Sequence, residues 1–227
     1  MLITIDDVLT AEELAEGRAL LARAPWVSGL VTAGTQAATV KNNQQIPEDT
    51  PELARLRQLV LTALNRNALF FTAALPLKIL PPFFNRYTGD SNHYGFHTDN
   101  AMRAMPDGSG YVRADVSATL FFSDPDDYEG GVLTVEDTFG SHGVKLKAGS
   151  MVVYPSSSIH EVSPVTRGER VSCFMFMQSM VRDAGERRTL FDLDMALLGL
   201  RQAHGETPDV VRLTGIYHNL LRRWADS

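Results

Sequence analysis

The hydrophobic and polar positions along the chain follow a helical pattern up to about residue 73. Thr10 is suited to cap a helix, and Glu13 stands where the acidic partner of a capping box belongs. The apolar positions of this first helix are Leu14, Leu20 and Leu21. A second helix is expected over residues 51–64, because apolar side chains recur there along one side. These side chains are Leu53, Leu56, Val60 and Leu64.

A polar segment at residues 40–45 separates the two expected helices, and Lys41 is its only charged residue. The segment could overhang a binding site and recognise a substrate through hydrogen bonds from its amide side chains. An inter-helix polar loop without a role in binding explains the same residues equally well. The pattern alone leaves both interpretations open.

From about residue 74 to residue 180 the pattern changes to short runs rich in Val, Phe, Tyr and Thr, separated by Gly, Pro and Asp. Such runs are typical of β-strands joined by turns. The expected strands cover residues 78–87, 116–123, 132–136, 144–146, 150–154, 159–162 and 170–180. Turns are expected at residues 124–131 and 148–149. Many short antiparallel strands at this spacing predict a β-sandwich or a jelly roll.

Helical periodicity returns over residues 181–227, where Thr207 and Pro208 mark a helix start with proline at its first position. The apolar stripe that follows contains Val210, Leu213, Tyr217, Leu220, Leu221 and Trp224. We expect this helix face to pack on the barrel or on another subunit. The stripe is therefore compatible with a monomer or with a homo-oligomer formed through the C-terminal helices. Residues 1–180 are expected to form the main domain, and residues 181–227 a helical extension.

Length and composition limit the classes of protein to which the chain can belong. Its 227 residues and 25.0 kDa suit one domain of moderate size with a small appendage. Contents of 44% hydrophobic and 21% charged residues exclude a disordered or collagenous chain. The single cysteine, Cys173, excludes an intrachain disulfide and is expected to be a core thiol. The net charge of −6 disfavours nucleic acid and anionic membranes as partners.

The first residues and the longest apolar run argue against export and membrane insertion. Asp6 and Asp7 stand where a signal peptide needs positive charge, and no apolar segment follows them. The apolar run over residues 68–77 is too short to span a bilayer and is interrupted by Pro76. We therefore expect a cytoplasmic protein.

The candidate chemistry begins with His97 and Asp99, which are two residues apart. In an extended segment both side chains point to the same side, so an imidazole nitrogen and a carboxylate oxygen can meet at one metal ion. A surface turn with two unrelated polar side chains is an equally good interpretation of this pair alone.

A third candidate metal ligand, His160, follows an apolar strand that ends at Tyr154 and Pro155. His160 begins the next expected strand, where its side chain can face the interior of a sheet. Two histidines and one carboxylate on one face leave coordination positions open, as in non-haem iron(II) oxygenases. A site made of several thiolates is excluded, because the chain has one cysteine.

Arg170 comes ten residues after His160, across a turn that contains Gly168. If the two lie on adjacent strands of a hairpin, both can point inward, and a buried arginine needs an anionic partner. Its guanidinium suits the far carboxylate of a dicarboxylate such as 2-oxoglutarate. The hydroxyl of Tyr87 could bind the same carboxylate, although a rim aromatic is an equal alternative.

Several other polar residues have expected positions near the site or at the surface. Asn100 and Arg103 follow the ligand motif and are further candidates for substrate contact. His93 could line the entrance of the site, but a loop histidine without a role is the expected alternative. His142 is expected in a hairpin turn and Arg167 at the surface.

These residues together resemble the prolyl 4-hydroxylase-like branch of the Fe(II)/2-oxoglutarate-dependent dioxygenases. The resemblance rests on the series Tyr87, His97-x-Asp99, His160 and Arg170. Residues 129–131, 147–149 and 154–160 match as well. More narrowly, the chain resembles a bacterial PKHD-type hydroxylase. The segments that carry this narrower match are residues 40–44, 80–87, 122–128 and 191–194. Val132 and Ser150 depart from the Glu and Asp that are common in the family, and neither is a candidate site residue.

The resemblance implies an α+β chain with a double-stranded β-helix, that is, a jelly roll with flanking helices. Its helical N-terminal part covers about residues 1–73 and its jelly-roll core about residues 74–180. The resemblance also implies that His97, Asp99 and His160 bind Fe2+ and that Arg170 anchors 2-oxoglutarate. L-ascorbate (vitamin C) is implied as a reductant of over-oxidised iron.

The implied activity is that of an oxidoreductase. Such a dioxygenase uses O2 and 2-oxoglutarate to hydroxylate a peptidyl or small-molecule substrate, with release of succinate and CO2. Relatives of this type are associated with bacterial iron uptake, which implies a link to iron homeostasis. Two alternative functions remain open. The first is a non-catalytic iron or 2-oxoglutarate sensor, which would use the same ligands without turnover. The second is a cupin-like metal-dependent isomerase or hydrolase, which would need neither Arg170 nor oxygen.

Overall fold

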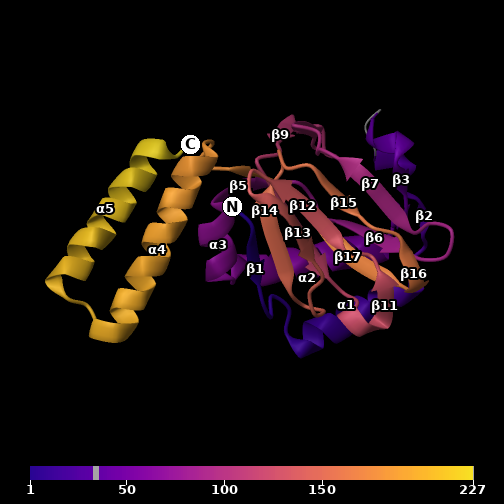
Figure 1. Cartoon of the computed structure of the whole chain (residues 1–227), viewed down its shortest axis with the longest axis horizontal. Coiled ribbons are helices and arrows are strands. Elements are labelled where there is room, and N and C mark those ends of the chain that lie inside the picture. Colours follow the sequence, from indigo (N-terminus) through magenta and orange to yellow (C-terminus); the bar gives the residue numbers. More distant parts are fainter. Residues whose placement is uncertain (33–35, 227) are drawn as a thin grey trace.

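The computed structural model describes residues 1–32 and 36–226. Two antiparallel sheets face each other as a jelly roll, helices cover one of them, and a pair of C-terminal helices projects to one side (Figure 1). The α+β jelly roll that the sequence predicts is therefore confirmed. Among the described residues, no helix is long and apolar enough to cross a membrane.

The two sheets differ in size. In order, the larger sheet consists of β1 (Ile3–Ile5), β14 (Met151–Pro155), β10 (Val116–Phe121), β17 (Arg170–Ser179), β6 (Phe83–Tyr87), β4 (Gln44–Gln45) and β2 (Val27–Ser28), with β5 (Pro76–Ile79) also paired to β17. The smaller sheet consists of β13 (Gly140–Val144), β12 (Leu133–Asp137), β15 (His160–Val162), β7 (His93–His97) and β3 (Lys41–Asn42). Separate strand pairs are β8 (Met102–Ala104) with β9 (Tyr111–Arg113), and β11 (Tyr128–Gly130) with β16 (Val165–Gly168).

Two helices begin at the caps that the sequence predicts, Thr10 and Thr207. In α1 (Ala11–Arg23), the Thr10 hydroxyl accepts from the Glu13 amide and the Glu13 carboxylate accepts from the Thr10 amide, which completes the capping box. Helices α2 (Pro51–Asn65) and α5 (Pro208–Trp224) begin after the caps Thr50 and Thr207. The remaining helices are α3 (Ala68–Ala74), α4 (Ala184–His204) and the 3-10 turns η1 (Gly29–Thr32), η2 (Ala37–Thr39) and η3 (Pro125–Asp127).

Strand β17 separates the hydrophobic core from the interior of the jelly roll, because alternate side chains point to opposite faces. Its outward side chains Val171, Cys173, Met175 and Met177 belong to the main core. Helices α1 and α2 cover this face with Leu20, Leu21, Leu53 and Leu56. Each fully buried leucine contributes about 1.5–3 kcal/mol. The inward side chains of β17, from Arg170 to Phe176, line the cavity between the two sheets.

Some elements differ from their predicted form. The strand expected over 78–87 is two strands, β5 and β6, because Pro81 and Pro82 cannot continue a hydrogen-bonded ladder. The apolar run at 68–77 contains α3, capped by the side chain of Asn67. The strand expected at 144–146 lies earlier, as β13, so His142 is in a strand and not in a turn. His93 is likewise in a strand, β7, where it pairs with Asn42.

The hairpin expected to join His160 and Arg170 does not exist. Strand β15, which begins at His160, pairs with β12 and β7 in the smaller sheet. Strand β17, which begins at Arg170, pairs with β10, β6 and β5 in the larger sheet. The intervening β16 pairs with β11. The two side chains therefore come from opposite sheets, and both line the cavity between them.

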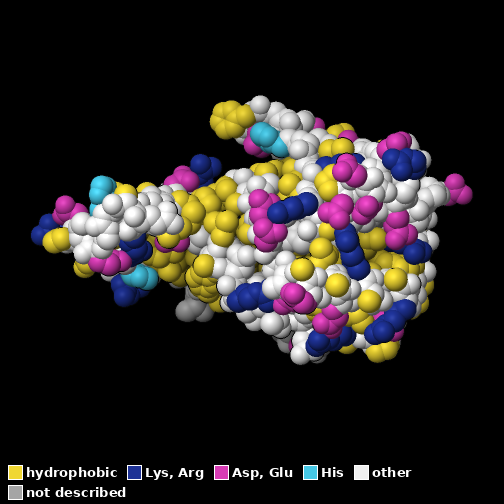
Figure 2. All heavy atoms as spheres, turned by 90° about the horizontal axis from the view of Figure 1, so that it is seen from below, with side chains coloured by type: hydrophobic (Ala, Val, Ile, Leu, Met, Phe, Trp, Pro, Cys, Tyr) yellow, Lys and Arg dark blue, Asp and Glu magenta, His cyan; other side chains and the backbone are white. Residues whose placement is uncertain are grey.

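The C-terminal helices form a hairpin beside the jelly roll. The apolar stripe of α5 packs within the chain against α4, with Val210, Tyr217, Leu190 and Leu197 in one core cluster. Figure 2 shows hydrophobic side chains gathered where the hairpin meets the jelly roll, while acidic and basic side chains are spread over the outer part of the hairpin and over the jelly roll.

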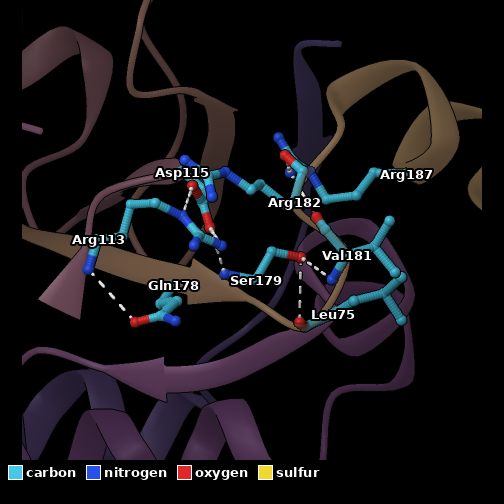
Figure 3. A network of polar contacts seen from close by, with 8 residues as sticks. All are labelled: Leu75, Arg113, Asp115, Gln178, Ser179, Val181, Arg182 and Arg187. Atoms are coloured by element: carbon cyan, nitrogen blue, oxygen red, sulfur yellow. Dashed lines mark hydrogen bonds and ion pairs between the residues drawn. The ribbon is translucent and has the colours of Figure 1, made fainter. Parts of the chain in front are cut away.

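A polar network ties this hairpin to the larger sheet (Figure 3). The Asp115 carboxylate, with 9% of its side chain exposed, accepts hydrogen bonds from the Arg113 guanidinium at 2.7 and 3.0 Å and from the Ser179 amide at 2.9 Å. The Ser179 hydroxyl donates to the Leu75 carbonyl. At the start of α4, the Arg187 guanidinium donates to the Val181 carbonyl at 2.7 Å. The end of β17 is thus fixed where the chain enters the hairpin.

Asp115→Ala is expected to lower the free energy of unfolding by about 1–3 kcal/mol, because the amide of Ser179 and the guanidinium of Arg113 lose their acceptor. Urea unfolding followed by circular dichroism measures this loss. The matched control is Asp209→Ala, which removes an Asp–Arg pair whose side chains are 84% and 78% exposed. The control is expected to change stability by less than about 0.5 kcal/mol. Equal stability of the two variants contradicts the assignment of the network.

Candidate functional site

A cavity of about 590 Å³, counting the space open to solvent, lies between the two sheets. Its lining includes Lys41, Asn43 and Gln45, from the polar segment near the N-terminus. These three residues are buried while Asn42 between them is exposed, as the alternation of an extended segment requires. The polar segment therefore lines the cavity, and it does so through the short strands β3 and β4.

Strand pairing brings the two candidate histidines together. His97 ends β7, His160 begins β15, and the register of these strands places the two residues opposite each other. Their ring centroids are 4.2 Å apart. Asp99 follows His97 beyond the strand end, and its Oδ1 lies 3.8 Å from Nε2 of His160. One nitrogen of each histidine and one oxygen of Asp99 lie within 4.8 Å of one another, so all three can bind one metal ion.

Backbone carbonyls orient both imidazole rings. Nδ1 of His97 donates to the Gly95 carbonyl at 2.8 Å, and Nδ1 of His160 donates to the Ser158 carbonyl at 3.0 Å. This tautomer leaves Nε2 of each ring with its lone pair toward the site. Burial, followed by the proximity of His160, lowers the pKa of His97 to about 3. His97 is therefore neutral at neutral pH, which is the form that binds metals.

The third candidate ligand, Asp99, is held by a serine on the larger sheet. The Ser117 hydroxyl lies 2.6 Å from Oδ2 of Asp99 and donates to it, while Ser156 Oγ lies 2.7 Å from the same hydroxyl. Because Oδ2 is engaged in this way, Oδ1 faces His160. Ser117 thus orients the carboxylate toward the two histidines.

Ser117→Ala is expected to weaken iron(II) binding roughly 10- to 100-fold, the usual cost of removing a group that orients a metal ligand. An anaerobic competition titration with a chelating dye measures the affinity. Ser163→Ala is the control, because its hydroxyl bonds to the Val132 amide away from the ligands. Identical iron affinities of the two variants contradict the role of Ser117.

Arg170 lies at the other end of the cavity and is only 1% exposed. Its Nη1 donates to the Ser172 hydroxyl at 2.7 Å, whereas its buried Nε has no hydrogen-bond partner among the described residues. A buried donor without an acceptor is costly unless a ligand supplies one. The guanidinium carbon lies 5.2 Å from the ring centroid of Tyr87 and 5.1 Å from that of Phe121. These rings shield the cation from water.

A chain of hydrogen bonds connects Arg170 to Tyr87. The Ser172 hydroxyl donates to Asn85 Oδ1 at 2.5 Å, and Asn85 Nδ2 donates to the Tyr87 hydroxyl at 3.2 Å. Tyr87 and Arg170 are opposite each other in the register of β6 and β17. Sequence reasoning missed Ser172 and Asn85. The period of two in the strands points to both, because each is two residues from a candidate and shares its face.

Gly131 leaves the space that Arg170 occupies. Its φ is +60°, and a Cβ there would lie 2.8 Å from the Tyr128 ring, 2.9 Å from Val165 and 3.0 Å from Cδ of Arg170. A side chain at this position would displace the arginine. This close approach explains why a glycine stands at position 131.

Of the two further candidates for substrate contact, one lines the cavity and the other does not. Arg103 lines the cavity, whereas Asn100 is exposed and lies outside its lining. Tyr94, which sequence reasoning missed, stacks on His97 with ring centroids 3.5 Å apart.

Burial lowers the pKa of Lys41 to about 7, and Arg103 adds to this effect while Asp99 opposes it. Arg167 is exposed and Cys173 is fully buried, as predicted.

Relatives of the chain match it over its whole length. Residues 82–178 match the 2OG-Fe(II) oxygenase superfamily, and residues 184–226 match the C-terminal domain of PKHD-type hydroxylases. A PKHD-type hydroxylase of Nitrosomonas europaea is 74% identical over 227 residues, and one of Azoarcus sp. is 73% identical over 228 residues. Both alignments cover 100% of each chain. The chain belongs to the PKHD-type hydroxylase family.

Solved structures agree with this assignment. A Pseudomonas putida prolyl-4-hydroxylase is 26% identical with a TM-score of 0.50, covering 78% of this chain and 92% of that chain. An oxidoreductase of the 2OG-Fe(II) oxygenase family from Burkholderia pseudomallei has the same fold, at 19% identity, a TM-score of 0.51 and coverage of 78% and 84%. This PKHD-type hydroxylase is therefore an oxygenase, and its superfamily implies iron(II) and 2-oxoglutarate.

The side chains present fit both implied groups. Two imidazoles and a carboxylate on one side are a donor set suited to iron(II) with positions left open. The unpartnered Nε of Arg170 is suited to a carboxylate of 2-oxoglutarate. Membership in an oxygenase family favours a catalytic oxygenase and disfavours the non-catalytic sensor and the cupin-like isomerase or hydrolase.

Proposed function

We propose that this PKHD-type hydroxylase converts a C–H bond of its substrate to C–OH while 2-oxoglutarate becomes succinate and CO2. His97, Asp99 and His160 are the proposed ligands of iron(II), and Arg170 is the proposed anchor of 2-oxoglutarate. The observation that carries the proposal is that one cavity contains a convergent His–Asp–His set and, at its other end, a buried arginine with a donor still unsatisfied.

Each of these residues has a defined task. The bound iron supplies the oxidative chemistry, in which one atom of O2 enters succinate and the other enters the product. Arg170 holds the far carboxylate, and Ser172 and Asn85 keep its guanidinium in place. Tyr87 and Phe121 keep water from that end of the cavity. Ser117 holds Asp99 so that the three ligands face the open part of the cavity.

The test is uncoupled turnover without a hydroxylated substrate. The purified chain, iron(II), O2 and 2-oxoglutarate labelled at its first carboxylate are expected to yield labelled CO2 and an equal amount of succinate. Release should require both iron and oxygen. Binding of both groups with no CO2 above the iron-free control contradicts a catalytic role.

Two finer parts of the proposal rest on the family resemblance. Ascorbate is proposed to restore iron that becomes oxidised during uncoupled turnover, so adding it should prolong CO2 release without changing the initial rate. A link to iron uptake is proposed as well, and its test is whether the protein level rises when the bacterium is starved of iron. An unchanged time course, or an unchanged protein level, removes the respective part.

A further inference from the structure

The cavity carries positive charge although the chain as a whole carries −6. Among the described residues, its charged lining consists of three cations, Lys41, Arg103 and Arg170, and one anion, Asp99. Iron(II) and doubly charged 2-oxoglutarate cancel each other when both are bound. The loaded cavity of the proposed enzyme therefore keeps an excess of one positive charge, or of two when Lys41, whose pKa burial lowers to about 7, is protonated. Neither bound group explains this excess.

The guanidinium of Arg103 has unused hydrogen-bonding capacity. It extends from β8, and its guanidinium carbon lies 4.5 Å from the ring centroid of Phe176 and 5.9 Å from that of Phe83. Among residues 1–32 and 36–226, nothing forms a hydrogen bond or an ion pair with this guanidinium. Burial lowers the pKa of Arg103, while Asp99 opposes that shift. The planar donors of Arg103 are thus held over an aromatic surface and remain available to an acceptor.

Arg103 and Arg170 lie at different ends of the cavity. The inward positions of β17 run from Arg170 through Ser172 and Phe174 to Phe176, and six residues of strand span about 20 Å. Phe176 is opposite Ser117, the serine that binds Asp99. Arg103, which stacks on Phe176, therefore lies at the level of the metal ligands, remote from the arginine that suits 2-oxoglutarate.

Lys41 adds a second positive charge at this end. It is opposite Tyr94 in the register of β3 and β7, and its Nζ lies 5.4 Å from the ring centroid of Tyr94. Tyr94 in turn stacks on His97. Arg103 lowers the pKa of Lys41, and Asp99 raises the pKa of both residues. Both cations thus line the cavity near the candidate metal ligands.

We infer that Arg103 and Lys41 form a substrate-anion site, with Phe174 and Phe176 as its apolar floor. This inference rests on the proposed function and names the substrate class: a molecule with a carboxylate next to an apolar or aromatic portion. The carboxylate binds the two cations, the apolar portion lies on the phenylalanines, and a neighbouring C–H bond is presented to the metal ligands. The carboxylate belongs to a free acid or to the C-terminus of a peptide, since both offer the same anion.

The experiment compares matched probes on the anaerobic protein loaded with iron(II) and 2-oxoglutarate. The free-acid pair is 3-phenylpropionate and its neutral amide. The peptide pair is an N-acetylated tripeptide ending in phenylalanine, with a free and with an amidated C-terminus. Titration calorimetry gives each dissociation constant. The acid is expected to bind at least about tenfold more tightly than its amide in one pair, and that pair identifies the source of the anion.

The variants locate the effect. Arg103→Met and Lys41→Met are each expected to lower the acid-to-amide preference to less than about threefold, and Arg103→Lys to keep part of it. The matched control is Arg86→Met, because Arg86 also lies over an aromatic ring, Trp26 at 4.8 Å, but does not line the cavity. The control keeps the full preference, and the affinity for 2-oxoglutarate stays within about twofold of the original protein.

Three results overturn the inference. The first is equal or undetectable binding of acid and amide in both pairs, and the second is an unchanged preference in Arg103→Met. The third is a loss of 2-oxoglutarate affinity in Arg103→Met, which assigns Arg103 to the cosubstrate. Failure of the proposed function has a different signature, because the unaltered protein then does not bind 2-oxoglutarate in an iron-dependent way.

Discussion

Alanine at His97, Asp99 or His160 is expected to abolish iron(II) binding at micromolar protein and to remove succinate formation. Each change deletes one of three donors that lie within 4.8 Å of one another. The loss in affinity should exceed the roughly 10- to 100-fold effect of deleting an outer hydrogen-bond partner. Asp99→Ala also removes the only carboxylate of the described cavity lining, which leaves the metal charge uncompensated.

Metal content after anaerobic dialysis and succinate yield are the two measurements for these variants. His142→Ala is the matched control, since that histidine is exposed and pairs with Asp137 outside the cavity. The control should keep full metal content and yield. A ligand variant that retains one iron per chain and normal succinate formation contradicts the assignment of the three ligands.

Arg170→Ala is expected to raise the dissociation constant of 2-oxoglutarate at least about 30-fold while iron(II) affinity stays nearly unchanged. Truncating one partner of a buried charge pair costs about 2–5 kcal/mol, and 2 kcal/mol corresponds to roughly 30-fold. Arg170 is far along β17 from the level of the metal ligands, which is why the two affinities should separate. Arg170→Lys should restore little, because an ammonium cannot reproduce the bidentate fork.

The thermal midpoint of the iron-loaded protein, with and without 2-oxoglutarate, measures this effect. Ligand that binds the native state raises the midpoint, and the rise should vanish in Arg170→Ala at concentrations that saturate the original protein. Arg167→Ala is the control, because Arg167 is exposed and pairs with Glu129 at the surface. A full ligand-induced rise in Arg170→Ala removes Arg170 from the proposed anchor role.

Local patterns predicted the elements whose causes are local. The Thr10–Glu13 capping box and the Thr207 cap depend on residues three apart, and both are formed as expected. The separation of His97 and Asp99 is equally local, since an extended segment alone turns both to one side. The limits of such patterns appear at Pro81 and Pro82, where a strand expected to be continuous is interrupted.

The pairing of distant strands could not be predicted. A position ten residues after His160 suggested a hairpin, yet β15 and β17 lie in different sheets. Which strands pair depends on contacts across the whole chain, so spacing in sequence does not fix it. Residues 40–45 and Arg103 were separate candidates for substrate contact, and their spacing in sequence could not show that Lys41 and Arg103 line the same cavity.

The most direct test of the central claim is an anaerobic titration of the metal-free protein with iron(II) and then with 2-oxoglutarate, followed by visible absorption. The account predicts a charge-transfer band that appears only after 2-oxoglutarate is added and saturates at one equivalent per chain. The band should be absent in His160→Ala. Iron that binds tightly without any band on addition of 2-oxoglutarate would contradict the account, because the cavity would then hold a metal site of another kind.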